Sequence, residues 1–475
     1  MKSRLIFSEI LQASLRGWDL RRSDECVLSL ALPINHIDPL NILPILADKE
    51  EFRFLWDQSP GLSIAAAGQC QNFELTGQRR FELAQRFSDE TLGRLVDVSP
   101  EAPSQSKPRI LFAFTFFEQT ADGKKNARTT PAVQAVLPHW QLTRQSSSGW
   151  LRLNAVVAHE ADVRGFVEQC WLMRENLSTS FVKKIYPKKI IAFSSKSSVA
   201  ETWQGNYRLA LAKGIDLVNS GELKKLVLAV RKLVFLENPL DPVSLLSSLR
   251  QHQRGSCRFL WQRSANESFF GASPERLLSL HKGNLQTDAL AGTARQKDNG
   301  LNLLKSEKNL REHELVVSSI KDQLLERGLN PNRLRYPRLA KHGHLIHLHT
   351  PIKASCKGLS ALQLVEMLHP TPAVAGLPRT KSLQWLRTLE PFDRECYAAP
   401  LGWIDTSGNA EFRVAIRCGY SRGNHLHLIA GAGLVQGSVV EAELQEVGLK
   451  LAVLADQLDV NLEPHEKSSS RHLMT

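Results

Sequence analysis

The segment IAGAGLVQGSVVEAELQEVGLK, residues 429–450, joins a glycine-rich apolar run to an amphipathic helical pattern. The apolar run predicts a strand that ends in a tight turn. After the turn, Ser438 and Glu441 match the Ser-x-x-Glu capping box, which predicts a helix that begins there and runs to about Leu458. A strand followed directly by a helix indicates a fold that mixes α and β elements.

Three glycines of this segment, at 431, 433 and 437, stand where a dinucleotide-binding turn would have them. Glycines between a strand and a helix let backbone amides approach an anion. The spacing here is GxGxxxG instead of GxGxxG, and the chain after Gly437 is too short for the rest of a nucleotide-binding domain. The pattern therefore predicts a glycine-lined turn that faces some anion, and not a dinucleotide site.

The predicted helix carries Glu443, Glu446 and Lys450 on one face, because their spacing is i, i+3 and i+7. A surface helix with an ordinary Glu446 to Lys450 ion pair would have the same spacing. Taken alone, this face therefore leaves both a surface role and a functional role open.

Helical and strand patterns alternate through the region from about 200 to 458. We expect helices at 206–217, from 241 onward and at 305–327, and a strand at 224–236. The strand places Lys225 at its start, among apolar residues. Such a lysine usually extends to solvent, but in a dry pocket near other cations it could act as a base.

Glu275 lies in a Ser-Pro-Glu corner between the apolar runs FFGA and LLSL. The corner could be only a turn. If the Glu275 side chain is partly buried, its pKa rises, and a carboxyl that keeps its proton near neutral pH can serve as a general acid.

Four histidines, at 342, 344, 347 and 349, are spaced closely enough to suggest a metal site. In one extended segment His347 and His349 would share a face, and His342 and His344 would lie on the other. The four could not then converge on one ion, and no cysteine or carboxylate follows nearby to complete a zinc site. A zinc site is therefore not expected.

The composition indicates a globular protein of a reducing compartment. The 475 residues include 60 Lys and Arg, 48 Asp and Glu, and seven scattered cysteines without a CxxC pair, which we interpret as free thiols. The formal charge of +12 could suit nucleic acid, but the basic residues form only short clusters without interleaved aromatics. The longest uncharged stretch, 423–440, contains four glycines and is a poor membrane span. We expect a cytoplasmic protein that binds neither nucleic acid nor membrane.

Several ordered motifs between about 205 and 456 resemble the chorismate-utilising enzyme family. The matching segments are KLVLA (225–229), FFGASPERLL (269–278), ALAGTAR (289–295), SEKNLREHELVVSSI (306–320), LIHLHTPI (345–352), LHPTPAVAGLPR (368–379), FDRECYAAPLGWID (392–405), EFRVAIRCG (411–419) and AGAGLVQGSVVEAELQEVGLK (430–450). An earlier segment, 52–68, is similar to the N-terminal hairpin of the family.

The resemblance implies an α+β fold of the anthranilate synthase component I type. We expect one large composite domain, with two antiparallel β-sheets in the interior and helices outside. Residues 1–200 would form a variable N-terminal half of this fold, residues 201–458 the chorismate-binding catalytic region, and residues 459–475 a flexible tail.

Within the family, the resemblance is closest to the isochorismate synthase branch. Lys225 stands where ammonia-using members typically have Gln, and HPTPAVAGLPR also resembles this branch. The implied reaction adds water at C2 of chorismate and removes the C4 hydroxyl. By the same resemblance, Lys225 is the base, Glu275 the general acid, and Glu312 and Glu446 the Mg²⁺ ligands.

The remaining site residues are also implied by the resemblance. Arg417 and the Gly431 amide would bind the enolpyruvyl carboxylate, and Lys450 would neutralise carboxylate charge. The others would line or orient the reacting ring: Gly292, Thr293, His347 and Ala373. The sequence departs from the family pattern at Val230, Glu395, Cys396, Ala399, Leu444 and Val447.

Two alternatives to an isochorismate synthase stay open from the sequence. One is a salicylate synthase, which would go on to eliminate pyruvate, and the other is an inactive chorismate-binding or scaffolding protein. The product could enter menaquinone, phylloquinone, siderophore or salicylate synthesis; the long N-terminal half favours a quinone. We expect a monomer or a weak homodimer.

Overall fold

The computed structural model describes residues 6–20, 26–34, 36–46, 51–58, 61–99, 102–118, 130–180, 198–199, 203–296 and 300–460. The tail predicted at 459–475 lies almost wholly outside these residues. The helices are α1 (Phe7–Asp19), α2 (Pro39–Leu46), α3 (Arg80–Gly93), α4 (Glu160–Ser180), α5 (Trp203–Asn219), α6 (Pro242–His252), α7 (Leu301–Lys305), α8 (Glu307–Glu326), α9 (Ala361–Leu368), α10 (Arg379–Leu389) and α11 (Val440–Ala455), with a 3₁₀ turn at Ser104–Ser106.

Two large sheets form the interior of the described structure. In spatial order the first contains β10 (Ser198–Val199), β11 (Lys225–Phe235), β23 (His425–Leu434), β22 (Cys418–Arg422), β13 (Glu267–Ser273), β12 (Cys257–Ser264), β2 (Arg53–Asp57), β3 (Ser63–Ala67), β8 (Trp140–Gln145), β9 (Ser148–Val156), β1 (Val27–Pro33) and β5 (Leu95–Asp97), with β19 (Gly376–Leu377) beside β11. The second contains β16 (Asn332–Arg333), β18 (Leu345–Ser355), β15 (Asn284–Arg295), β14 (Arg276–His281), β21 (Ala410–Val414), β20 (Pro400–Asp405), β6 (Arg109–Phe114), β7 (Val133–Leu137) and β4 (Gln71–Leu75), with β17 (Arg338–His342) beside β18.

Both sheets combine strands from the two halves of the chain. In the first sheet β2 pairs with β12, and in the second β6 pairs with β20. Each sheet therefore joins strands of the N-terminal half to strands of the C-terminal half. The described strand pairs are antiparallel except β1 with β5. One continuous hydrophobic core spans both halves. The expected α+β architecture, with two interior sheets in one composite unit, is confirmed.

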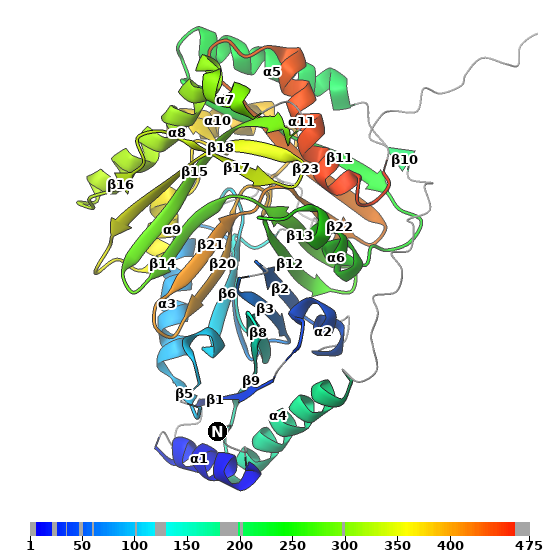
Figure 1. The fold of residues 1–475 in the computed structure, drawn as a ribbon, viewed down its shortest axis with the longest axis vertical. Helices are drawn as coiled ribbons and strands as arrows, with labels where there is room; N and C mark the ends of the chain where they lie inside the picture. The colour runs from blue at the N-terminus through cyan, green and yellow to red at the C-terminus, as the bar shows by residue number, and fades with distance from the viewer. Residues whose placement is uncertain are drawn as a thin grey trace, which may run out of the picture.

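The helices gather on the outside of the sheets. Figure 1 shows α5, α8, α10 and α11 around the strands of the C-terminal half, and α1 and α4 at the opposite end, beside β1 and β9. In the described ranges, no helix is both long enough and apolar enough to span a membrane. All seven cysteines lie within the described residues, and no disulfide bond joins any two of them.

Several local predictions are confirmed. The hairpin expected within 52–68 is β2 followed by β3. Helix α6 starts after Asp241, whose carboxylate accepts a hydrogen bond from the amide of Val243. The strand expected at 224–236 is β11, with Lys225 as its first residue.

Two predicted helix starts are wrong. The capping box does not form, because α11 begins at Val440, and the Ser438 hydroxyl instead accepts a hydrogen bond from the amide of Val435. The long helix expected from 305 is interrupted at Ser306, which ends α7 and caps α8 by accepting a bond from Asn309. Ser438 thus accepts from an amide before its helix, whereas Ser306 caps a helix that begins two residues later than predicted.

Candidate active site

The centre of the site is an ion pair between Lys225 at the start of β11 and Glu312 on α8. The Lys225 Nζ atom lies 2.9 Å from Glu312 Oε1, and the two side chains are 1% and 12% exposed. Gly433 of β23 leaves the room for this pair, because a Cβ atom there would lie 2.5 Å from Glu312 Oε1 and 3.2 Å from Lys225 Cε. The second glycine of the GxGxxxG pattern thus admits two side chains to one place.

Helix α11 brings a second pair of opposite charges to the same region. The Lys450 ammonium lies 2.6 Å from Glu446 Oε1 and donates a 2.7 Å hydrogen bond to the Gly431 carbonyl. Burial acts to raise the pKa of Glu446, but the positive charges of Lys450, Lys308 and Arg417 outweigh it and hold that pKa below its usual value. Glu446 is therefore a carboxylate at neutral pH.

Glu443 lies one turn before Glu446 and is bound by Lys308 of α8. Lys308 Nζ is 2.6 Å from Glu443 Oε1, and the Glu443 residue is 1% exposed. Burial, together with the negative charge of Glu446, raises the pKa of Glu443, while Lys308 opposes that rise. Lys308 also feels the charges of Glu312 and Glu446, so three carboxylates converge on one ammonium group.

Glu275 stands in the corner between β13 and β14 and is 3% exposed. Burial raises the pKa of its carboxyl to about 8, although the charges of Lys225 and Arg417 act in the opposite direction. The backbone is held in place because the Glu275 amide donates to the Ser273 hydroxyl and the Glu275 carbonyl accepts from the Val414 amide. The site therefore holds a carboxyl that keeps its proton at pH 7.

Arg417 enters the site from the turn before β22, in an unusual backbone conformation. Its φ angle is 53°, in the left-handed region that few residues other than glycine adopt. Its carbonyl accepts a 3.0 Å bond from the Ala272 amide, and Gly271 permits this approach, since a Cβ there would lie 2.6 Å from that carbonyl oxygen. The buried guanidinium feels the charges of both Glu275 and Glu446, so it lies within electrostatic range of the predicted acid and of the α11 carboxylate.

His347 on β18 is joined to both residues that the sequence places around the ring. Its Nδ1 atom lies 3.1 Å from the Gly292 carbonyl and 3.3 Å from the Thr293 hydroxyl. Burial and the nearby charge of Arg417 lower the pKa of His347 well below its usual value, so the imidazole is neutral. Its other nitrogen, Nε2, is buried and has no hydrogen-bond partner among the described residues.

The expected separation of His342 from His347 is wrong. Residues 338–355 form a hairpin of β17 and β18, with a turn at Gly343 where φ is 58°. The turn folds His342 back, and its ring centroid lies 6.0 Å from that of His347. His349 points elsewhere and pairs with Asp288 at 3.2 Å. The described residues contain no group of three metal-ligating His, Cys, Asp or Glu side chains.

Ala373 lies in the turn between α9 and β19 and is half-buried. No described contact joins its side chain to the predicted acid or base. Its loop does reach β11, because the Val227 amide donates a 2.8 Å bond to the Ala375 carbonyl. The structure thus brings the other predicted site residues into contact or electrostatic range of one another, and connects Ala373 through the backbone of its loop.

Two residues of the site were missed at the level of sequence. A Cβ atom at Gly431 would lie 3.2 Å from the Tyr397 hydroxyl, and Tyr397 acts electrostatically on Arg417, so this buried tyrosine lies against the predicted carboxylate site. The other is Lys308, four residues before Glu312 on α8. Both stand inside motifs quoted above, and the i, i+4 spacing of Lys308 and Glu312 was the available signal.

Glu395 shows how one departure from the family pattern is accommodated. It stands where the resemblance places a glycine, and its φ angle of 49° lies in the left-handed region that favours glycine. The glutamate is held by Arg422, whose Nη1 lies 3.1 Å from Glu395 Oε1, and by the Thr130 hydroxyl at 2.7 Å from Oε2. These bonds stabilise a backbone conformation that glutamate alone disfavours.

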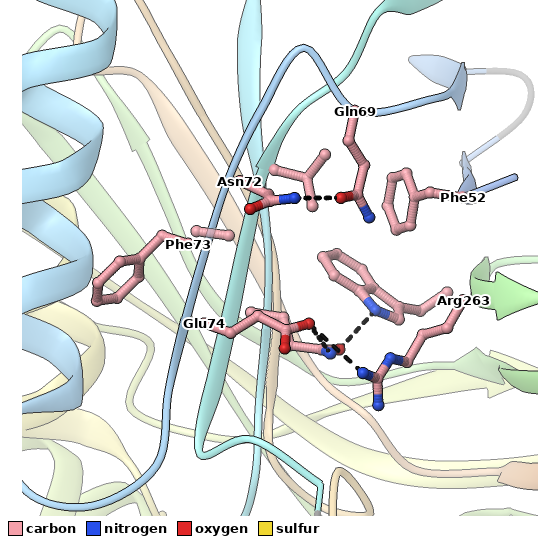
Figure 2. A pocket seen from close by; sticks show the side chains of 10 residues that line it. Phe52, Gln69, Asn72, Phe73, Glu74 and Arg263 are labelled. Atoms are coloured by element: carbon pink, nitrogen blue, oxygen red, sulfur yellow. Dashed lines mark hydrogen bonds and ion pairs between the residues drawn. The ribbon is translucent and has the colours of Figure 1, made fainter.

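A separate cavity of about 150 Å³ is lined by residues of β4 and β7 from one sheet and by Trp261 and Arg263 of β12 from the other. Figure 2 shows the side chains of Arg263 and Glu74 pointing toward each other, with Gln69 and Phe52 beside one another. Its polar groups bond to one another: Gln134 donates to Glu74 at 2.8 Å, and Trp261 donates to Gln134 at 2.8 Å. No predicted site residue lines this cavity.

Comparisons with known proteins identify the family of the chain. A family model described as chorismate binding enzyme matches residues 11–459. The chain is 28% identical over 472 residues to isochorismate synthase MenF of Bacillus subtilis strain 168, covering 96% of this chain and 98% of that protein. It is 30% identical over 366 residues to isochorismate synthase EntC of Escherichia coli K12, covering 75% of this chain and 86% of that protein.

The fold is also similar to a solved structure. The menaquinone-specific isochorismate synthase MenF of Escherichia coli superposes with a TM-score of 0.73 at 24% identity, covering 95% of this chain and 99% of that one. The match of the family model over nearly the whole chain, together with the EntC similarity, is decisive. The chain belongs to the chorismate-binding enzyme family.

Proposed function

We propose that the protein is an isochorismate synthase, which converts chorismate to isochorismate by adding water at C2 and releasing the C4 hydroxyl. The observation that carries this proposal is that a buried lysine, Lys225, lies within electrostatic range of a buried carboxyl, Glu275, whose pKa is raised by burial to about 8. The charge of Lys225 acts on Glu275, so base and acid share one site. The curated relatives MenF and EntC are both named isochorismate synthases, which supports the same activity here.

The proposed chemistry needs one proton acceptor and one proton donor. Lys225 must first lose the proton that it carries in the ion pair with Glu312. Its neutral amine then accepts a proton from the water that attacks C2, and the two ring double bonds shift as the C4–O bond breaks. Glu275 gives its proton to the departing oxygen, which leaves as water, because hydroxide is a poor leaving group. Water is added and water is lost, so no oxidant or reductant is needed.

Positive charge in the site supports a substrate with two carboxylates. Arg417 can bind a carboxylate through its planar guanidinium, and the Tyr397 hydroxyl lies beside the same place. Lys450 adds a second cation, fixed between Glu446 and the Gly431 carbonyl. The neutral His347 can present its unpartnered Nε2 to a hydroxyl group of the ring.

We further propose Mg²⁺ as the cofactor, held by Glu312 and Glu446. The donor set fits, since Mg²⁺ commonly binds one or two protein carboxylates and completes its shell with substrate oxygens and water. The absence of a side chain at Gly433 is also compatible with a bound ion, because a Cβ atom there would lie 2.5 Å from Glu312 Oε1. Glu312 and Glu446 would hold the ion, whose positive charge would offset the repulsion between these carboxylates and those of chorismate, and Lys225 would then share Glu312 with it.

The pathway is proposed from the extent of the similarity. The match to MenF of Bacillus subtilis covers nearly all of both proteins, whereas the match to EntC covers three quarters of this chain. This favours supply of isochorismate to menaquinone or phylloquinone synthesis over siderophore synthesis. We also propose that the enzyme acts as a monomer or weak homodimer in the cytoplasm.

Product analysis tests the proposal directly. Purified protein is incubated with chorismate and Mg²⁺, and the products are separated by liquid chromatography. Isochorismate alone is the expected product. Salicylate formed without an added lyase would assign a salicylate synthase, and anthranilate formed only with ammonia would exclude hydration. Chorismate binding without turnover would indicate a binding or scaffolding protein.

A further inference from the structure

The buried ion pair between Glu390, just after α10, and Arg394 lies outside the residues discussed for catalysis. The Arg394 side chain is 0% exposed and that of Glu390 is 2% exposed. Arg394 donates from Nε to Glu390 Oε2 at 2.7 Å and from Nη2 to Oε1 at 2.5 Å. A fully buried ion pair contributes little net stability compared with apolar side chains of the same size, so its presence calls for another reason.

The pair completes an edge of β11 that no described strand covers. Beside that edge, β19 pairs only with Lys225 and Leu226, and β10 only with Val234 and Phe235. In the gap, Arg394 Nη2 donates to the Val227 carbonyl at 2.7 Å, and Glu390 Oε1 accepts from the Ala229 amide at 2.8 Å. One carboxylate and one guanidinium therefore take the place of a neighbouring strand, two and four residues after Lys225.

Arg394 also fixes the loop that carries Ala373. Its Nη1 atom donates to the Val374 carbonyl at 2.7 Å, while the neighbouring Ala375 carbonyl accepts from the Val227 amide. The same arginine stacks over Phe116, and its carbonyl accepts from the Tyr397 amide at 2.9 Å. Arg394 thus forms hydrogen bonds with the strand that carries Lys225, with the loop that carries Ala373 and with Tyr397.

We propose that Glu390 and Arg394 are positioning residues. Together they set the distance between Lys225 on β11 and the loop that carries Ala373, the predicted wall of the substrate site. A guanidinium is suited to this task because its donors have fixed directions and can bond two carbonyls and a carboxylate at once. A lysine keeps the charge but has a single nitrogen, so it cannot hold Val227, Val374 and Glu390 in the same geometry. The inference rests on the proposed function for its kinetic consequence.

The kinetic test compares Arg394→Lys with a matched control, Arg152→Lys. Arg152 is also buried and bonds a backbone carbonyl and an aspartate, Asp97, but at the far end of the fold. We expect Arg394→Lys to lower kcat by about 10- to 100-fold with little change in KM, because a small displacement of reacting groups slows chemistry more than binding. We expect Arg152→Lys to leave kcat unchanged at a temperature where both variants are folded. Equal kcat values in the two variants would overturn the proposal.

A second measurement does not depend on turnover. Hydrogen exchange followed by mass spectrometry should show faster exchange of 224–231 and 371–377 in Arg394→Lys, and not in Arg152→Lys. Glu390→Gln, which keeps an acceptor for the Ala229 amide, should show a smaller increase and a smaller loss of kcat. If exchange in both segments is unchanged, Glu390 and Arg394 do not act as positioning residues, whether or not chorismate is the substrate. An inactive wild-type enzyme with the expected exchange would instead contradict the proposed function.

Discussion

Lys225 Nζ lies 2.9 Å from Glu312 Oε1, so the predicted base and a predicted metal ligand form an ion pair inside the protein. The lysine side chain is 1% exposed and that of Glu312 is 12% exposed, so the Lys225 ammonium is almost shielded from solvent. The lysine that is to receive a proton from water and the carboxylate that is to bind a cation are therefore linked. Substitution of Glu312 should therefore change proton transfer to Lys225, and substitution of Lys225 should change cation binding by Glu312.

Lys225→Met should abolish hydration while chorismate binding remains measurable. Loss of a general base typically costs about 100-fold or more in rate, whereas the groups expected to bind the substrate carboxylates are untouched. Lys232→Met is the matched control, because Lys232 is equally buried on the same strand, 2% exposed, and is not near the predicted acid. Turnover measured by chromatography and binding measured by calorimetry check both points. Activity that survives in Lys225→Met would remove it as the base.

The rate should fall as the pH rises through about 8. Burial raises the pKa of Glu275 to about 8, so its carboxyl is protonated below that pH and can donate, and is ionised above it and cannot. In Glu275→Gln the residual rate should be low and should lack this alkaline decline. A pH profile of kcat for both proteins checks the assignment. An identical alkaline decline in Glu275→Gln would assign it to another group.

The same residue predicts a change of stability with pH. Because the folded-state pKa of Glu275 lies above its usual value, the folded protein binds more protons than the unfolded chain between about pH 4.5 and 8. This group therefore lowers the free energy of unfolding as pH rises through that window. Glu275→Gln should accordingly raise Tm at pH 8 more than at pH 5, as measured by calorimetry. A uniform shift of Tm at the two pH values would contradict the buried, raised-pKa carboxyl.

Gly433→Ala should lower both stability and activity. The added Cβ would lie 2.5 Å from Glu312 Oε1, and overpacking of this kind costs about 1–3 kcal/mol of the free energy of unfolding. It would also displace the Lys225 side chain, 3.2 Å away at Cε. Gly448→Ala on α11 is the control, since no described atom lies within 4 Å of the new Cβ, and a helical Gly→Ala change should stabilise by about 0.5–1 kcal/mol. Denaturant unfolding and kcat together distinguish the two.

Glu446→Gln should raise the Mg²⁺ concentration needed for half-maximal activity by about tenfold or more, because it removes one of two anionic ligands for a hard cation. Glu441→Gln on the same helix is the control: this residue is largely exposed and pairs with Arg208 at the surface. The enzyme is first treated with a chelator and then titrated with Mg²⁺. Equal Mg²⁺ requirements in the two variants would exclude Glu446 as a ligand.

Much of the fold and of the site follows from local sequence. The motifs identify the family because each holds its chemistry within one element: Lys225 at the start of a strand, Glu312 within a helix, Glu275 in a corner between strands. The glycine pattern at 431–437 predicted an anion-facing turn without naming its partners. Helix starts were less predictable, because a serine hydroxyl can accept from an amide after it, as Ser306 does from Asn309, or before it, as Ser438 does from Val435.

Only the tertiary structure decided how these groups act on one another. The pKa of Glu275 depends on its burial, and the Lys225 to Glu312 pair joins residues far apart in the chain, in a space that Gly433 leaves open. The hairpin that turns His342 back to His347, and the Glu390 to Arg394 pair along β11, likewise depend on which segments meet. The sequence by itself determined the family and the types of side chain in the site, because both can be recognised in short continuous motifs. Distance, burial and charge between segments arise only when both sheets close around the site.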